Sequence, residues 1–428
     1  MPKNNYVEIN SYYIPFLAIM VFSLLNGFFN SIMIQYGTNI FPYNNFLFLP
    51  SDRHADLINV VSSFSEVGKS SFLLHNPYGD VDALNTNSLN HFFLPPLVVF
   101  ISLLFEKLWS ITNINIVLFA FYSFSFLAIS FLASYFKKSS TDYFIIFFGI
   151  LLSYPVLFAL SRGHIFSFIS SIAIILLVYN SIIKKNTFFL FILFAIAVNI
   201  KPNAIVLLPL FLIFETKNFL KNITIALISS ILLFILFLLI DNYLYPQYTL
   251  GRFIKGLGTY YHLYVLNHSI QIEGGWFSNS LLTAIKFATS CTKNLLTTNM
   301  IAKANNIIAI SLASLVLLSS LQYIKRKMTK FEFLFLLISF YVLMSSVYAT
   351  YHLMVFLAFI LSAIKINNCI LDDFPNRLIL FTSVFLLIPK NYLFCHNVSY
   401  EMILNPMILF SISVYILYKS IRLKHAKN

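Results

Sequence analysis

A succession of apolar runs separated by short basic clusters constrains this chain more than any other feature. Hydrophobic residues make up 59% of the 428 residues and charged residues 10%, whereas a soluble domain averages about 45–50% apolar and about 25% charged residues. One soluble core cannot bury that much apolar surface, so we expect a single integral membrane domain over residues 1–428, all-α and polytopic. This composition excludes cytosolic enzymes, secreted disulfide scaffolds and nucleic-acid-binding modules.

The basic residues set the predicted topology. The net charge is +13, but its clusters lie between apolar runs, so we interpret them as topology signals and contacts with anionic lipids of the bilayer, not as a nucleic-acid footprint. In chain order they are Lys137-Lys138, Lys184-Lys185, Lys217 with Lys221, Lys325-Arg326-Lys327 with Lys330, and Arg422, Lys424 and Lys427. If all are cytoplasmic, the chain has twelve spans and both termini are inside. The first run is then a retained helix rather than a cleaved signal peptide.

The predicted spans leave one run and two long connections outside. The spans cover residues 13–33, 115–136, 143–160, 165–183, 187–200, 203–215, 222–240, 304–324, 331–348, 351–364, 377–395 and 403–420. Residues 94–109 begin with Pro95-Pro96 and contain charges, and a span there would move Lys137-Lys138 outside, so we predict an interfacial or re-entrant helix. The outer loops 34–114 and 241–303 are long enough to expect a function for them.

The first candidate for chemistry is Asp56. It follows Ser51–Ala55 and precedes Leu57 and apolar residues at helical spacing, which predicts a short amphipathic helix on the outer membrane surface. A carboxylate there suits a general base that acts on a lipid-delivered substrate. The alternative is a helix cap, a frequent use of Asp that contributes about 1 kcal/mol.

A second group of candidates is cationic. Lys201-Pro202 forms the tip of a predicted hairpin between two spans that are short for a hydrocarbon core of about 30 Å. Arg162, with Gly163 and His164, ends a neighbouring outer turn. Two cations near the outer surface suit an anionic ligand such as phosphate. The alternative is that these long side chains only reach lipid headgroups.

The remaining candidates lie in later outer segments. The loop 241–303 contains Arg252, Lys255, His262 and Asn267, and residues of these kinds bind phosphates or sugar hydroxyls. An interfacial aromatic belt is the alternative. The pair Tyr351-His352 follows another outer turn, and packing is the alternative role for that histidine. The cysteines and histidines lack the spacing of a metal site.

In their order along the chain, these features resemble the GT-C glycosyltransferases that use polyprenol-phosphate sugars, and most of all the bacterial α-mannosyltransferase-like family 87. The resemblance covers about residues 13–365. The matching elements are Asp56 in Ala55–Ile58, Asn76-Pro77-Tyr78, Leu94–Leu97, Arg162–His164, Lys201-Pro202 with Leu207–Pro209, Asn267-His268-Ser269 or Asn279 and Ser280, and Tyr351-His352. His164 stands where the family has Gln, which is a departure from the pattern.

The resemblance implies a GT-C-like bundle and a function. The enzyme would transfer a hexose, with mannose as the first candidate, from a polyprenyl-phosphate donor to a glycolipid or glycan. Transfer would invert the configuration at the anomeric carbon and take place on the extracytoplasmic side of a bacterial inner membrane. Asp56 would be the base, and no metal or cofactor would be needed. The donor phosphate would be bound by Lys201, Arg162, Arg252 and Lys255, and the substrates by Tyr78, His164, His262, Asn267, Tyr351 and His352.

Two other classes of membrane protein fit the same composition. An O-antigen-type glycan polymerase or ligase shares the long outer loops and relies on loop arginines. A lipid-linked glycan transporter is also polytopic and basic, but it would carry charges along a central path and broken helices in paired halves. Here the charges gather at one face and no paired halves are evident.

Overall fold

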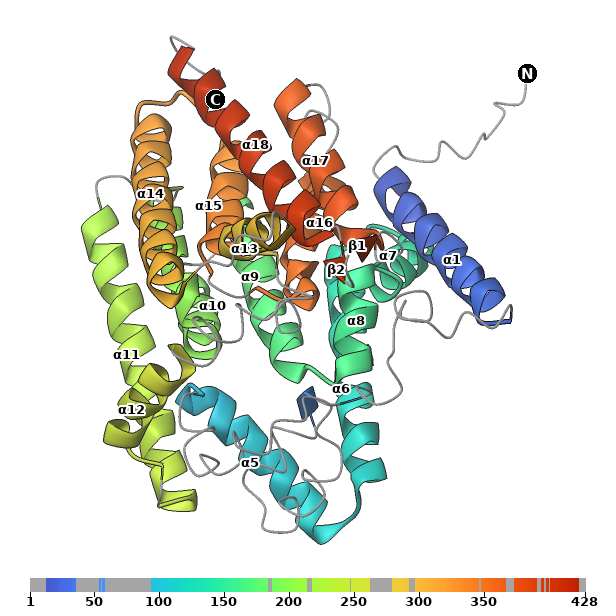
Figure 1. The fold of residues 1–428 in the computed structure, drawn as a ribbon, viewed down its shortest axis with the longest axis vertical. Helices are drawn as coiled ribbons and strands as arrows, with labels where there is room; N and C mark the ends of the chain where they lie inside the picture. Colours follow the sequence, from blue (N-terminus) through green and yellow to red (C-terminus); the bar gives the residue numbers. More distant parts are fainter. Residues whose placement is uncertain are drawn as a thin grey trace.

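Helices that run roughly along one common axis dominate the computed structural model (Figure 1). The structure describes residues 13–35, 54, 56–57, 94–183, 187–213, 218–246, 248–261, 279–291, 297–345, 348–366, 373–390, 394–395, 398–399 and 401–422. Within these ranges the only strands are β1 (Phe394–Cys395) and β2 (Val398–Ser399), which pair antiparallel in one small hairpin. The all-α prediction is therefore confirmed for this part of the chain.

The helices follow the predicted runs closely. In chain order they are α1 (Ile14–Gln35), α5 (Pro96–Ile111), α6 (Ile114–Phe136), α7 (Ser140–Leu151), α8 (Tyr154–Arg162), α9 (Ile165–Ile183), α10 (Thr187–Ile200), η3 (Pro202–Ile213), α11 (Phe219–Leu244), α12 (Leu250–Tyr260), α13 (Leu281–Cys291), α14 (Thr298–Ile324), α15 (Lys330–Met344), η6 (Thr350–Phe356), α16 (Leu357–Ile366), α17 (Phe374–Leu387) and α18 (Glu401–Arg422).

Several of these helices can cross a membrane. Five described helices are long and apolar enough, namely α6, α9, α11, α14 and α18, and a sixth crossing results if the bent pair α7–α8 is one span. Shorter apolar helices correspond to most of the other predicted spans. A membrane-embedded helical protein is thus supported, whereas the number twelve stays a prediction.

Two predicted spans have different boundaries in the structure. The predicted helix 143–160 is broken between α7 and α8, which meet at 60°. Pro155 at the start of α8 has no amide hydrogen to continue the helical ladder, which accounts for the break. The predicted span 377–395 ends at Leu387, and strand β1 begins at Phe394.

Helices α9 and α15 form the centre of the bundle. Thirteen consecutive residues of α15, Phe331–Leu343, are buried, and so are most residues of α9. Helices α11 and α14 are peripheral and expose Leu and Ile side chains such as Leu232 and Ile310. This distribution suits a bundle whose outer helices face lipid, because apolar side chains there need no protein partner.

The turn between α14 and α15, which carries Lys325-Arg326-Lys327, and the end of α18 lie together at the upper end of the bundle in Figure 1. Lys365 at the end of α16 donates to the backbone oxygen of Lys137 at 3.2 Å. Lys419 near the end of α18 lies 3.3 Å from Glu332 of α15 and 3.8 Å from Asp373 before α17. These described helix ends thus lie together, and their cytoplasmic location stays a prediction from the positive-inside rule.

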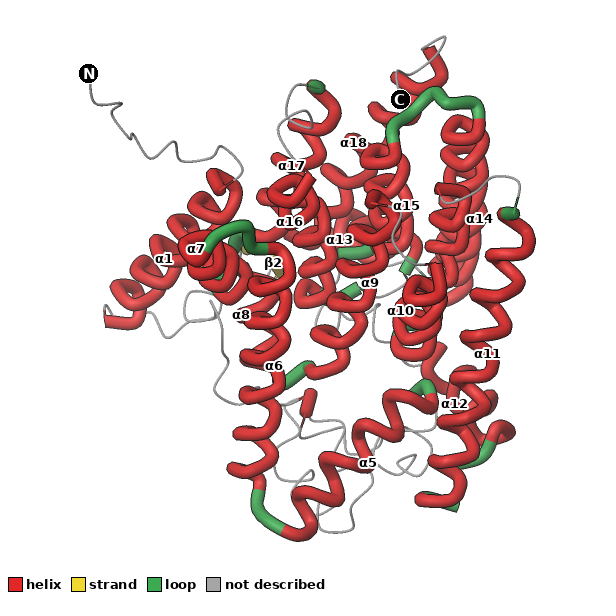
Figure 2. The backbone as a smooth tube through the Cα atoms, turned by 180° about the vertical axis from the view of Figure 1, so that it is seen from behind, coloured by secondary structure: helices red, strands yellow, loops and turns green. Residues whose placement is uncertain are grey.

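Helix α5 crosses the opposite end of the bundle obliquely, as both views show (Figures 1 and 2). Its buried residues lie in its first half, from Pro96 to Ser102. Just before it, the Leu94 carbonyl accepts a hydrogen bond from Tyr248 Oη at 2.5 Å. An interfacial or re-entrant position for this helix stays a prediction. The predicted loop 241–303 is partly helical, because it contains α12 and α13.

Candidate active site

Asp56 and Arg162 form a bidentate ion pair. Arg162 Nη2 donates to Asp56 Oδ1 at 2.7 Å, and Arg162 Nε donates to Oδ2 at 3.2 Å. The two side chains are 14% and 20% exposed, respectively. A guanidinium that donates in parallel to both carboxylate oxygens fixes the orientation of the carboxylate as well as its charge.

The end of α8 explains how the two residues meet. Helix α8 ends at Arg162 because Gly163 has a left-handed φ of 74° and caps it. A Cβ atom at Gly163 would lie 2.7 Å from Leu57 Cβ and 3.3 Å from His54 Cα. Only glycine allows the segment that carries Asp56 to pack this closely against the helix end.

His54 anchors the segment that carries Asp56. Its backbone N–H donates to the Ser161 carbonyl at 2.8 Å, and its Nε2 lies 2.6 Å from Tyr122 Oη of α6. His54 also has a positive φ of 59°, which is uncommon outside glycine and is held here by these two contacts. The carboxylate of Asp56 is therefore positioned by α6 and α8 together.

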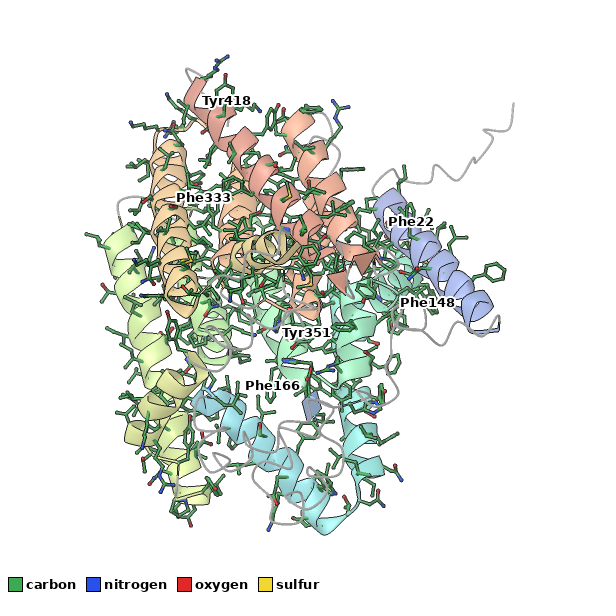
Figure 3. The ribbon with its side chains drawn as sticks, in the orientation of Figure 1. Phe22, Phe148, Phe166, Phe333, Tyr351 and Tyr418 are labelled. Carbon is green, nitrogen blue, oxygen red and sulfur yellow. The ribbon has the colours of Figure 1, made fainter. Side chains whose placement is uncertain are left out.

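A cluster of aromatic rings begins next to the ion pair, at His164. His164 directly follows Gly163, and its ring centroid lies 4.2 Å from that of Tyr351 and 5.3 Å from that of His352. Phe158 of α8 also stacks on Tyr351, with ring centroids 5.8 Å apart. Figure 3 labels Tyr351 near the centre of the molecule, with Phe166 below it towards α5. The ends of α8 and η6 thus build one cluster.

The hydrogen bonds of His164 determine its tautomer. The backbone N–H of Ser167 donates to Nδ1 at 3.1 Å, and the Ser167 hydroxyl lies 2.7 Å from the same atom. A backbone N–H can only donate, so Nδ1 must be unprotonated. Neutral His164 therefore carries its proton on Nε2.

Lys201 lies in the sharp turn between α10 and η3. Its backbone N–H still bonds to the Ala197 carbonyl at 2.8 Å, and its own carbonyl accepts from Ala204 N–H at 2.8 Å. Beside it, Asn203 Nδ2 donates to Ser345 Oγ at 2.6 Å, which ties the hairpin tip to the end of α15. The predicted hairpin is confirmed, with a 3₁₀ helix as its second arm.

These groups change one another's ionisation. Burial raises the pKa of Asp56, but the positive charge of Arg162, with smaller contributions from His164 and Lys201, outweighs it and leaves this pKa below its ordinary value. Burial lowers the pKa of Lys201 to about 8, against the attraction of Asp56. Burial likewise lowers the pKa of His164 to about 4. At neutral pH the cluster holds a carboxylate, two cations and a neutral imidazole.

The structure brings together six of the predicted site residues: Asp56, Arg162, His164, Lys201, Tyr351 and His352. Arg252 and Lys255 are exposed on α12, whose Phe253 packs with Tyr248 and Val99. The predicted residues Tyr78, His262 and Asn267 lie outside the described residues. Among those that are described, His, Cys, Asp and Glu form no group that could hold a metal ion.

Some residues of the site had no predicted role. Tyr122 and Ser167, which hold His54 and His164, lie within apolar runs that the sequence identifies only as spans. Arg162 was predicted to bind phosphate, and the structure shows it paired with Asp56. The positive φ at Gly163 had a sequence signal, because glycine before a new apolar run is a common helix cap.

Comparison of the chain with protein-family models, with curated proteins and with solved structures found no significant match in any of the three.

Proposed function

We propose that the chain is a membrane glycosyltransferase. It transfers a hexose, with mannose as the first candidate, from a polyprenyl-phosphate donor to a hydroxyl of a glycolipid or glycan at the outer face. The observation that carries this proposal is the pairing of Asp56 with Arg162, within electrostatic reach of Lys201. An ionised carboxylate with a nearby cation at one end of a membrane bundle provides both a base and a phosphate partner. The order of the motifs along the chain supports the same class of enzyme.

In this mechanism Asp56 accepts the proton of the acceptor hydroxyl. The hydroxyl oxygen bonds to the anomeric carbon, the bond from that carbon to the phosphate oxygen breaks, and the phosphate leaves with the electron pair. Arg162 uses one lone pair on each carboxylate oxygen, and each oxygen keeps another for the acceptor. The lowered pKa of Asp56 makes it a weak base, so proton transfer would follow the growth of positive charge on the attacking oxygen.

Lys201 would stabilise the departing phosphate. Its pKa of about 8 leaves the ammonium mostly protonated at pH 7. Partial burial strengthens its attraction to an anion, because the local dielectric is lower than that of water. In the direct displacement proposed here, neither a covalent intermediate nor a metal is required.

The test is transfer by the purified protein from radiolabelled polyprenyl-phosphate mannose to a membrane glycolipid extract. Asp56→Asn keeps the shape of the side chain but removes the base, so we expect turnover to fall by about 10²–10⁴-fold. The matched control is Asp373→Asn, since Asp373 lies beside Lys419 at the other end of the bundle. Near-normal turnover by Asp56→Asn at an unchanged protein level would reject the assignment. Transfer of whole glycan blocks without single hexoses would favour the polymerase or ligase.

A further inference from the structure

A buried polar network joins the start of α18 to the segment that carries Tyr351 and His352. Thr350 Oγ1 donates to Glu401 Oε1 at 2.7 Å and accepts from Asn279 Nδ2 at 3.1 Å. Asn405 Nδ2, one helical turn after Glu401, donates to Asn279 Oδ1 at 2.6 Å. All four side chains are at most 1% exposed. The network therefore lies within the protein and not at its surface.

The same network holds the backbone on both sides of Thr350. The Asn279 N–H donates to the Tyr348 carbonyl at 2.7 Å. Tyr348 Oη in turn donates to the His352 carbonyl at 3.1 Å. The segment 348–352 is thus held from outside at Tyr348 and Thr350 and closed internally by the bond from Tyr348 to His352. The two rings that contact His164 lie inside it.

Burial of the Glu401 carboxylate costs desolvation free energy, which points to a specific role for this residue. Lys390, whose Nζ donates to the Ile388 carbonyl at 2.8 Å, is close enough to interact electrostatically with the Glu401 carboxylate. A buried ion pair is weak evidence for a role in stability, since apolar residues of similar size often serve as well. The hydrogen bonds of such a buried network instead define one arrangement of the elements that they join.

We propose that Glu401 and Thr350 are positioning residues that set the register of η6, so that Tyr351 and His352 face His164 in the substrate site. This inference rests on the proposed function and extends it to α18, which lies outside the part of the chain that shows the family resemblance. Neither residue touches the reacting atoms. Each acts through the backbone of residues 350–352.

The test combines turnover with a measurement that needs no substrate. Thr350→Val removes the hydroxyl at almost constant volume, and Thr350→Ser restores it. Ser413→Ala is the matched control, because Ser413 is fully buried on α18 and its hydroxyl has no hydrogen-bond partner among the described residues. Misplacement of a site by about 1 Å can cost about 10²-fold in rate, so we expect Thr350→Val to lower kcat by about 10- to 100-fold. Thr350→Ser and Ser413→Ala should stay within about twofold of wild type.

The second measurement is the alkylation rate of the Tyr351→Cys variant by a small maleimide, in a background with Cys291, Cys369 and Cys395 replaced by serine. Adding Thr350→Val or Glu401→Ala should raise this rate several-fold, whereas adding Ser413→Ala should not. Unchanged kcat and unchanged alkylation in Thr350→Val would overturn the inference, and so would equal effects of Thr350→Val and Ser413→Ala. If the wild-type protein transfers no sugar, the proposed function fails, and alkylation alone still decides the positioning role.

Discussion

The ion pair between Asp56 and Arg162 predicts how the rate should depend on pH. The folded pKa of Asp56 is below its ordinary value, so its carboxylate stays ionised at neutral and mildly acidic pH. The stability that the pair contributes is present above the unfolded pKa and is lost only as the pH falls through the lower, folded pKa. Asp56 should therefore produce no acid limb in the pH–rate profile of the wild-type protein between about pH 5 and 9.

Arg162→Gln removes the main charge that opposes burial of the carboxylate. Each of the two charge-assisted hydrogen bonds is worth about 1.5–3 kcal/mol, and water replaces part of that value because the side chains are 14% and 20% exposed. We expect the transition state for transfer to lose about 2–3 kcal/mol of stabilisation when the carboxylate is no longer held in place. This loss is equivalent to a fall of about 30- to 150-fold in kcat/KM. The pKa of Asp56 should also rise, because burial raises it and less positive charge then opposes that rise.

The assay is kcat/KM for hexose transfer between pH 5 and 9, with Arg162→Lys and Arg377→Gln beside Arg162→Gln. Arg162→Lys keeps the charge but not the paired donors, so its kcat/KM should lie between those of Arg162→Gln and Arg377→Gln. Arg377 is exposed on α17 and should not matter. The reasoning is refuted if Arg162→Gln keeps the wild-type rate and shows no new loss of activity towards low pH.

Three further predictions concern Lys201, Gly163 and the topology. Lys201→Ala should lower kcat more than it weakens donor binding, with partial recovery in Lys201→Arg; equal kcat in all three proteins would make Lys201 only an interfacial anchor. Gly163→Ala should destabilise the protein by about 1–3 kcal/mol in thermal unfolding, because of the left-handed φ and the clash with Leu57; Gly258→Ala, with open space around it, is the control. A Lys138→Cys variant should resist membrane-impermeant thiol reagents in intact cells, and labelling from outside would disprove the predicted orientation.

The sequence predicts the helices well because the signal is local. Residues 94–109 were predicted as a separate short helix, and α5 covers Pro96–Ile111. The Lys201 turn follows from Pro202 in the same way. The break before α8 also had a local signal in Pro155, which the prediction of one helix over 143–160 did not use.

The site is only partly predictable, because its contacts join distant parts of the chain. Asp56 and Arg162 are 106 positions apart, and nothing in either local sequence shows that one neutralises the other. The sequence predicts each of them separately, as a carboxylate and as a cation near the outer surface. The role of Glu401 has no local signal, because a single acid before an apolar run is typical of any helix start, and its partner Thr350 is 51 positions away.

The structure also offers a physical reason why histidine can stand at position 164, where the resembling family has glutamine. The Ser167 N–H occupies Nδ1, and burial lowers the pKa of His164 to about 4, so the ring is neutral at pH 7 with its hydrogen on Nε2. A neutral imidazole in this state offers one N–H donor, as a glutamine amide does, without adding a third positive charge beside Arg162 and Lys201. Hydrogen bonding to the ring therefore gives the histidine the chemistry of an amide donor.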